Sequence, residues 1–241
     1  MSGTMREIIH LSSETLLIDW NLILKKIGVS GNKDHIKIIN DIFRTAKEKF
    51  LESCNPTGII SDITIEEFDA VYRGEGKNES LTPLTAIFRR ADNLALYIVT
   101  LGNVLSQMIT DLIKSNSITM AHMMDIIASE VTEIVADSIQ NYYIKKLSEK
   151  DLINERTRVL RYSPGYCGWH ISAQKKIFKH VRPEEIGISL NDGFIMDPLK
   201  SSSGVMISGP GEIHNFKNNF IFCQKCETHN CRERIKAGTL N

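Results

Sequence analysis

The sequence predicts an α+β fold in which helices flank one largely antiparallel sheet. Residues 120–143 form a long amphipathic segment that indicates a helix, and residues 93–102 form a nearly continuous apolar run that indicates a strand. Helical and strand segments follow one another without the regular alternation that is typical of a parallel sheet. The chain has 241 residues, 42% of them hydrophobic and 24% charged, so it is long enough to bury one core.

The first half of the chain is expected to contain one helix and two strands. The helix follows Asn32 or Asp34 as its N-cap and ends before Pro56. Residues 58–72 are rich in β-branched side chains and indicate a strand, and the apolar run at 93–102 is expected to be central in the sheet. The apolar residues that predict the helix, at steps of three and four, are Ile36, Ile39, Phe43, Ala46 and Phe50.

The second half is expected to begin with the longest helix of the chain. Apolar residues recur along one face of residues 120–143. Residues 173–181 indicate a short helix, and the segments at 187–198 and 203–211 indicate short strands with turns between them. The polar residues that lie opposite or beside the apolar face of the long helix are Glu130, Glu133, Asp137 and Gln140.

The composition argues against two classes of partner. Lys and Arg together number 29, and so do Asp and Glu, so the net charge should draw neither nucleic acid nor an anionic membrane. The N-terminal residues lack the pattern of a secretory signal, and no stretch of about 18 uncharged apolar residues occurs in the sequence. We therefore expect a cytoplasmic protein without nucleic-acid or membrane partners. The motifs of P-loop nucleotide hydrolases, serine hydrolases and zinc proteases are also missing.

Residues 161–170, RYSPGYCGWH, combine a guanidinium, a turn and three aromatic rings. Pro164 and Gly165 turn the backbone, and Gly165 lets a ligand approach main-chain N–H groups. The turn can set Arg161 and Tyr166 on two sides of one loop, where Arg161 would bind a carboxylate and Tyr166 would offer a flat ring with a polar tip. The alternative is a plain surface turn with an exposed arginine.

Residues 161–210 resemble the activation domain of cobalamin-dependent methionine synthases. That family carries R-x-x-x-G-Y, then a helix, then I-G-x-x-L, then F-x-M-x-P-x-x-S-x-S-G, and all of these occur here in the same order. The resemblance is clearest over residues 125–210 and can be traced from the N-terminus. It implies a single C-shaped domain with a twisted, mostly antiparallel sheet flanked by helices. It also implies S-adenosylmethionine binding and reductive methylation of a corrinoid.

The resemblance further implies roles for single residues. Arg161 matches the arginine that binds the S-adenosylmethionine carboxylate, with Gly165 beside the ligand, and Tyr166 matches the tyrosine beside the corrin in the docked state. The family's two adjacent tyrosines on the ligand are missing from SGPGEIHNF, where Phe216 is the candidate replacement. Acidic residues at family positions near the cationic end of the ligand are Asp19, Glu133 and Glu155. A solvated helix face explains Glu133 equally well.

A second cluster, FCQKCETHNCRER, lies near the C-terminus. Cys223, Cys226 and Cys231 have spacings that suit a zinc site, with His229 or Cys167 as the fourth ligand. The same cysteines, with Cys167 or Cys54, suit an iron–sulfur cluster, and the alternative is three incidental thiols. Five cysteines, an odd number, favour a reduced compartment. We expect an S-adenosylmethionine-binding domain over residues 1–210 and a Cys-rich segment over residues 211–241.

The function expected from the resemblance is reactivation of a separate corrinoid protein. A D-x-H-x-x-G cobalamin signature is missing here, so a corrinoid-binding methyltransferase subunit such as methionine synthase must carry the cobalamin, and a low-potential donor must supply one electron. The chain would then act as a methyltransferase component. The alternatives are a domain that senses S-adenosylmethionine without methyl transfer, an interaction module stabilised by its metal site, and an ordinary small-molecule methyltransferase. A glycine-rich strand–turn–helix near the N-terminus, which the last would need, is absent.

Overall fold

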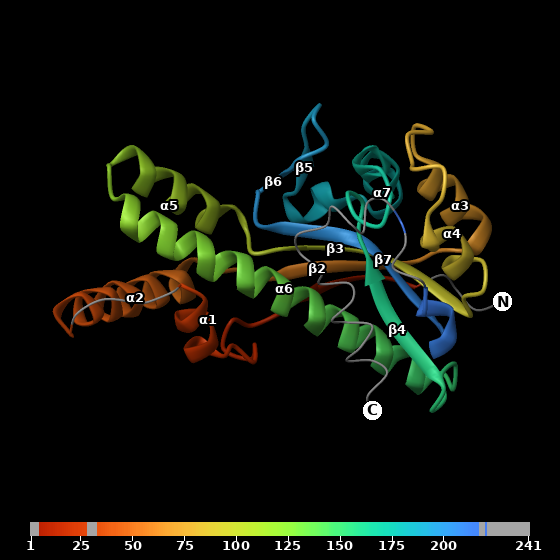
Figure 1. Ribbon diagram of the computed structural model, residues 1–241, viewed down its shortest axis with the longest axis horizontal. Helices are drawn as coiled ribbons and strands as arrows, with labels where there is room; N and C mark the ends of the chain where they lie inside the picture. Colours follow the sequence, from red (N-terminus) through yellow and green to blue (C-terminus); the bar gives the residue numbers. More distant parts are fainter. Residues whose placement is uncertain (1–4, 28–32, 217–219, 221–241) are drawn as a thin grey trace.

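The computed structural model describes residues 5–27, 33–216 and 220, and a five-stranded antiparallel sheet lies at the centre of this part of the chain (Figure 1). Neighbouring strands follow the order β1-β2-β3-β7-β4, and each neighbouring pair is antiparallel. The expected α+β class is confirmed. The strands are β1 (Arg6–His10), β2 (Thr57–Asp62), β3 (Asn93–Thr100), β7 (Ser201–Pro210) and β4 (Thr157–Tyr162).

Helices cover both faces of the sheet (Figure 1). On one face, α6 (Ile118–Glu149) packs against the sheet and carries α1 (Trp20–Lys26), α2 (Lys33–Ser53) and α5 (Asn103–Lys114). On the other face lie α3 (Ile65–Arg73), α4 (Pro83–Phe88) and α7 (Gln174–Val181). A short hairpin of β5 (Ser189–Leu190) and β6 (Met196–Asp197) precedes β7. The sheet therefore separates two hydrophobic cores, and α6 is the main cover of one of them.

The central strand β3 explains why its sequence is almost continuously apolar. Ala95, Tyr97 and Val99 face the core under α6, and Leu94, Leu96 and Ile98 face the core under α3, α4 and α7. Because successive side chains of a strand point to opposite faces, a strand covered on both sides needs apolar residues at every position. The expected central place of this strand is confirmed.

Two sequence predictions differ from the structure, and some elements, β4 among them, were not predicted. The segment 58–72 was expected to be a strand, but the strand β2 ends at Asp62 and α3 follows. Thr64 and Glu67 form a capping box at the start of α3, a local signal that stops the strand and begins a helix. The strand β7 is long rather than short, with ten residues, because it pairs with both β3 and β4. The strand β4, which no pattern predicted, lies at the sheet edge and is only partly apolar.

Candidate functional site

Arg161 lies on the edge strand β4 and points to the face of the sheet that α6 covers. Val159, two residues earlier on the strand, belongs to the core under α6, whereas Tyr162 belongs to the opposite core. The Arg161 side chain is only 1% exposed, and its guanidinium carbon lies 5.8 Å from the centre of the Tyr97 ring. The alternative of an exposed arginine on a surface turn is therefore wrong.

Polar side chains of α6 hold the guanidinium of Arg161. Glu133, Asp137 and Gln140 follow one another at steps of four and three, so they share one face of the helix. Nη2 of Arg161 lies 2.5 Å from Oδ1 of Asp137 and 3.6 Å from Oε2 of Glu133. Nε of Arg161 donates to Oε1 of Gln140 at 3.1 Å. Nε2 of Gln140 in turn donates to the carbonyl oxygen of Val159 at 3.2 Å, which fixes the orientation of the amide.

One nitrogen of this guanidinium has no acceptor within the described ranges. Nη1 of Arg161 is buried and has no hydrogen-bond partner among the residues that the structure describes. An unpaired buried donor costs about 1–3 kcal/mol, and more if it is charged. The Glu133 and Asp137 side chains are 56% and 60% exposed, so they remain accessible beside it. Nη1 can donate to a ligand carboxylate, and the Glu133 and Asp137 carboxylates beside it can bind a ligand cation. This arrangement suits the zwitterionic head group of an amino acid.

The loop at residues 163–170 connects this cluster to an exposed aromatic ring. Gly165 has a φ of +93°, a conformation that favours glycine, and its N–H donates to the Trp169 carbonyl oxygen at 2.7 Å. Trp169 is buried and packs edge-on against Phe68, with ring centroids 5.6 Å apart. Tyr166, between these two residues, is 54% exposed. The loop therefore presents the Tyr166 ring to solvent on a rigid base, while the Gly165 N–H is already bonded within the loop.

The surface loop at residues 74–80 holds residues 168–170 in place. The Glu79 N–H donates to the Gly168 carbonyl oxygen at 3.0 Å. The His170 N–H donates to Oδ1 of Asn78 at 2.9 Å, and Nδ2 of Asn78 donates to the Tyr72 carbonyl oxygen at 2.7 Å. These bonds join two segments that lie far apart in the sequence.

The other two acidic candidates lie outside the Arg161 cluster. Asp19 is exposed and caps α1, where its Oδ1 accepts a hydrogen bond from the Leu22 N–H at 2.9 Å. Glu155 is exposed in the turn before β4, and its main-chain oxygen accepts from Nη1 of Arg158 at 2.9 Å. Within the described residues, neither carboxylate forms an ion pair or hydrogen bond with Arg161. Of the three acidic candidates, only Glu133 is brought to the arginine.

Phe216 lies on the other side of the sheet from the Arg161 guanidinium. It packs against the core under α3, α4 and α7, and its ring centroid is 6.1 Å from that of Phe220. Nearby, a 3₁₀ turn (Gly211–His214) continues from β7 and buries His214. Nδ1 of His214 lies 2.9 Å from the hydroxyl oxygen of Tyr162, and burial lowers the pKa of His214 to about 4. The structure thus does not bring Phe216 and the Arg161 guanidinium together.

The proposed metal ligands Cys223, Cys226, His229 and Cys231 lie outside the described residues. Cys167, the other candidate ligand, is partly buried against the core under α3, α4 and α7, whereas Cys54 packs against the core under α6. Burial raises the pKa of the Cys54 thiol to about 12, so this thiol is protonated at neutral pH. Within the described ranges, no group of three or more His, Cys, Asp or Glu side chains is arranged to hold a metal ion.

The structure adds site residues that sequence reasoning missed. Asp137 and Gln140 contact Arg161 directly, and their spacing from Glu133 was a usable signal, because residues four and three apart share one helix face. Tyr97 flanks the guanidinium, and its hydroxyl oxygen lies 3.2 Å from Oγ of Ser163 at the start of the loop. Nothing in the apolar run of β3 distinguishes Tyr97 from an ordinary core residue.

A search for membrane spans among the described helices finds none that is long and apolar enough to cross a bilayer.

Comparisons with known proteins agree with the fold and with the motifs around Arg161. The model of the family "Vitamin B12 dependent methionine synthase, activation domain" matches residues 73–233. A solved structure, "Crystal Structure of the MetH Reactivation Domain bound to AdoHcy", is similar with a TM-score of 0.59 and 17% identity, over 98% of this chain and 90% of that chain. No curated protein matches. At this identity the solved structure shows the shared fold, and the family model, which spans more than half of the sequence, shows that this chain belongs to the family of vitamin B12-dependent methionine synthase activation domains.

Proposed function

We propose that this chain binds S-adenosylmethionine at Arg161 and supports the reductive methylation of cob(II)alamin on a separate corrinoid protein. The observation that carries the proposal is the buried guanidinium of Arg161, whose Nη1 has no partner in the described part of the chain. Arg161 opens the R-x-x-x-G-Y motif in a member of the activation-domain family. A solved protein of the same fold was crystallised with AdoHcy, the product that S-adenosylmethionine leaves after giving up its methyl group.

The amino-acid end of S-adenosylmethionine matches the charges around Arg161. Its ammonium would lie against Asp137 and Glu133, whose side chains are more than half exposed. Its carboxylate would accept from Nη1, which is buried in the unliganded chain and becomes reachable once the covering side chains move. A ligand that carried only a carboxylate would be repelled by Asp137, so the ammonium group is what makes binding favourable. For Asp19 and Glu155 to contact the ligand, α1 and the turn before β4 would have to move toward it. Gly165 would lie beside the ligand.

The reaction balances with one electron and one methyl group. A low-potential donor gives one electron to cob(II)alamin, which becomes cob(I)alamin. The cobalt electron pair then attacks the sulfonium methyl group, so a cobalt–carbon bond forms, a carbon–sulfur bond breaks and AdoHcy leaves. The residues of this chain need only orient the methyl donor, S-adenosylmethionine, and exclude water, because the corrinoid itself supplies the nucleophile.

Tyr166 is suited to the contact with the partner's corrin. Its ring is 54% exposed on a loop that Trp169 anchors, so it can cover a flat macrocycle without first being uncovered. In this scheme the cobalamin and the electron donor come from partners in the cytoplasm. A metal or iron–sulfur cluster on Cys223, Cys226 and Cys231 would be an additional part of the same chain.

Calorimetry tests the donor site. Arg161→Gln should weaken S-adenosylmethionine binding about 10-fold or more, because a charge-assisted contact contributes about 1.5–3 kcal/mol. The matched control is Arg44→Gln, since Arg44 is 70% exposed and pairs with Asp41 of its own helix. Equal affinities of the two variants would overturn the role of Arg161.

Spectroscopy tests the reaction itself. Protein, a cob(II)alamin-loaded carrier, a low-potential reductant and S-adenosylmethionine should together give the methylcobalamin absorption spectrum. Tyr166→Ala should slow this change and leave the affinity for S-adenosylmethionine unaltered. If S-adenosylmethionine binds and no carrier from the host is methylated, the chain is a sensor of S-adenosylmethionine and the reactivation proposal fails.

A further inference from the structure

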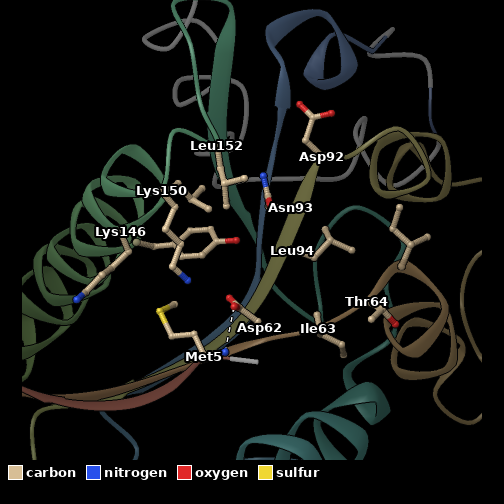
Figure 2. Close-up of a pocket in the computed structure, with 13 residues that line it drawn as sticks. Met5, Asp62, Ile63, Thr64, Asp92, Asn93, Leu94, Lys146, Lys150 and Leu152 are labelled. Carbon is tan, nitrogen blue, oxygen red and sulfur yellow. Dashed lines mark hydrogen bonds between the residues drawn. The ribbon is translucent and has the colours of Figure 1, made fainter. Parts of the chain in front are cut away.

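A pocket of about 320 Å³ lies at the C-terminal end of α6, where this helix crosses the end of β2 and the start of β3 (Figure 2). Small-molecule sites usually enclose roughly 300–1,000 Å³, so this pocket suits a small ligand. Arg161, Glu133 and Asp137 are not among the described residues that line it. Its apolar walls are Met5, Ile63, Leu94, Leu147 and Leu152.

One cation and one anion face each other across the pocket. Figure 2 shows Lys150 extending toward the Asp62 carboxylate, while Lys146 extends away from it. Oδ2 of Asp62 accepts from the Met5 N–H at 3.1 Å, which fixes the carboxylate. Burial raises the pKa of Asp62, and the Lys150 charge opposes this change, so the two groups act on each other through space. Within the described part of the chain, they form no direct ion pair.

Lys146 is committed elsewhere, which leaves Lys150 as the cation of the pocket. Nζ of Lys146 lies 3.9 Å from the Glu149 carboxylate and 5.3 Å from the centre of the Tyr142 ring. The carboxylate of Asp92, at the rim, is directed away from Asp62 (Figure 2).

A buried hydroxyl also belongs to the pocket. Tyr143 lines it and is 1% exposed, and its hydroxyl has no hydrogen-bond partner among the described residues. Burial, together with the Asp62 charge, raises the pKa of Tyr143, so the phenol stays protonated and can donate. A ligand oxygen would satisfy this donor, whereas in the unliganded protein it is an unfavourable buried group.

We propose that this pocket binds a free α-amino acid with an apolar side chain, with its carboxylate on Lys150 and the Tyr143 hydroxyl and its ammonium on Asp62. In the unliganded pocket, Lys150 and Asp62 attract each other only at a distance. A zwitterionic head group between them would form a direct ion pair with each. A simple anion would be attracted by Lys150 but repelled by Asp62, and a simple cation would be attracted by Asp62 but repelled by Lys150. The apolar walls would take the ligand side chain.

The test uses the full chain and L-leucine as the probe, followed by two-dimensional NMR titration or calorimetry. Isocaproate and isoamylamine are the matched controls, because each keeps the hydrocarbon part and lacks one of the two charges. We expect saturable leucine binding with a Kd of about 1 mM or tighter, and much weaker binding of both controls. S-adenosylmethionine should bind equally well in the presence of leucine, which separates this proposal from the Arg161 site.

Variants assign the contacts. Lys150→Met and Asp62→Asn should each weaken leucine binding on the order of 10-fold, since each removes one charge-assisted contact. The asparagine still accepts from Met5, so the local backbone is kept. Lys145→Met is the matched control on the same helix, because Lys145 is 75% exposed and does not line the pocket.

Tyr143→Phe should weaken binding without lowering the melting temperature, because it removes a hydroxyl that has no partner in the described chain. The proposal is overturned if leucine, norleucine and phenylalanine all fail to saturate. It is also overturned if isocaproate binds as tightly as leucine, or if Lys150→Met and Lys145→Met bind alike. These results would mark an ordinary water-filled pocket or an anion site.

Discussion

Replacing Arg161 by methionine should abolish its ligand contact at little cost in stability. The variant loses the hydrogen bonds to Asp137 and Gln140, each of which contributes about 1.5–3 kcal/mol. It is also relieved of Nη1, which has no partner among the described residues and costs about 1–3 kcal/mol. Asp137 and Glu133 are more than half exposed, so removal of the arginine leaves no buried charge behind. Methionine fills most of the volume of the arginine stem and packs adaptably.

The free energy of unfolding should therefore fall by no more than about 3 kcal/mol, which corresponds to a loss in melting temperature of about 12 °C or less. Denaturant titration followed by circular dichroism measures this, alongside calorimetry with S-adenosylmethionine. Met206→Ala is the matched control, because the fully buried Met206 lies opposite Arg161 on β7 and its truncation should cost about 2–5 kcal/mol. A loss above about 3 kcal/mol for Arg161→Met would refute the reasoning and make Arg161 a structural clamp between β4 and α6.

Three further predictions concern the rest of the chain. Gly204→Ala should lower the free energy of unfolding by about 2 kcal/mol or more, because the added Cβ would lie 2.1 Å from the Tyr162 carbonyl oxygen; Gly193→Ala, which meets only an asparagine side chain, should be nearly neutral in the same denaturant titration. His214 has a pKa of about 4 when folded and about 6.5 when unfolded, so the unfolded chain binds the proton first. Stability should thus be intact above about pH 6.5 and fall by at most about 3 kcal/mol as the pH drops toward 4, and His214→Gln should flatten this stretch of the pH–stability curve. Elemental analysis of anaerobically purified protein should find zinc or iron. Serine substitutions at Cys223, Cys226 and Cys231 should remove this metal.

Local signals in the sequence predicted those elements whose pattern has a single reading. The apolar run ending in Gly102 predicted a central strand, and the stripe from Met120 to Tyr143 predicted the long helix, because both patterns repeat over many residues. The segment 58–72 failed because its β-branched residues were weighed above the capping box at Thr64, which shows where the strand stops. The strand β4 has too few apolar residues for a sequence pattern to predict it, and it is a strand because it pairs with β7.

The sequence by itself determined the α+β class, the family motifs around Arg161 and the expectation that this arginine receives a carboxylate. Only the tertiary structure decided that Arg161 is buried, that Asp137 and Gln140 hold it, and that Phe216 lies across the sheet from it. It also brought Asp62 and Lys150 to one pocket. The physical reason is that motifs and periodicity record neighbours along one element, whereas burial and charge pairing depend on which elements the shared cores bring together.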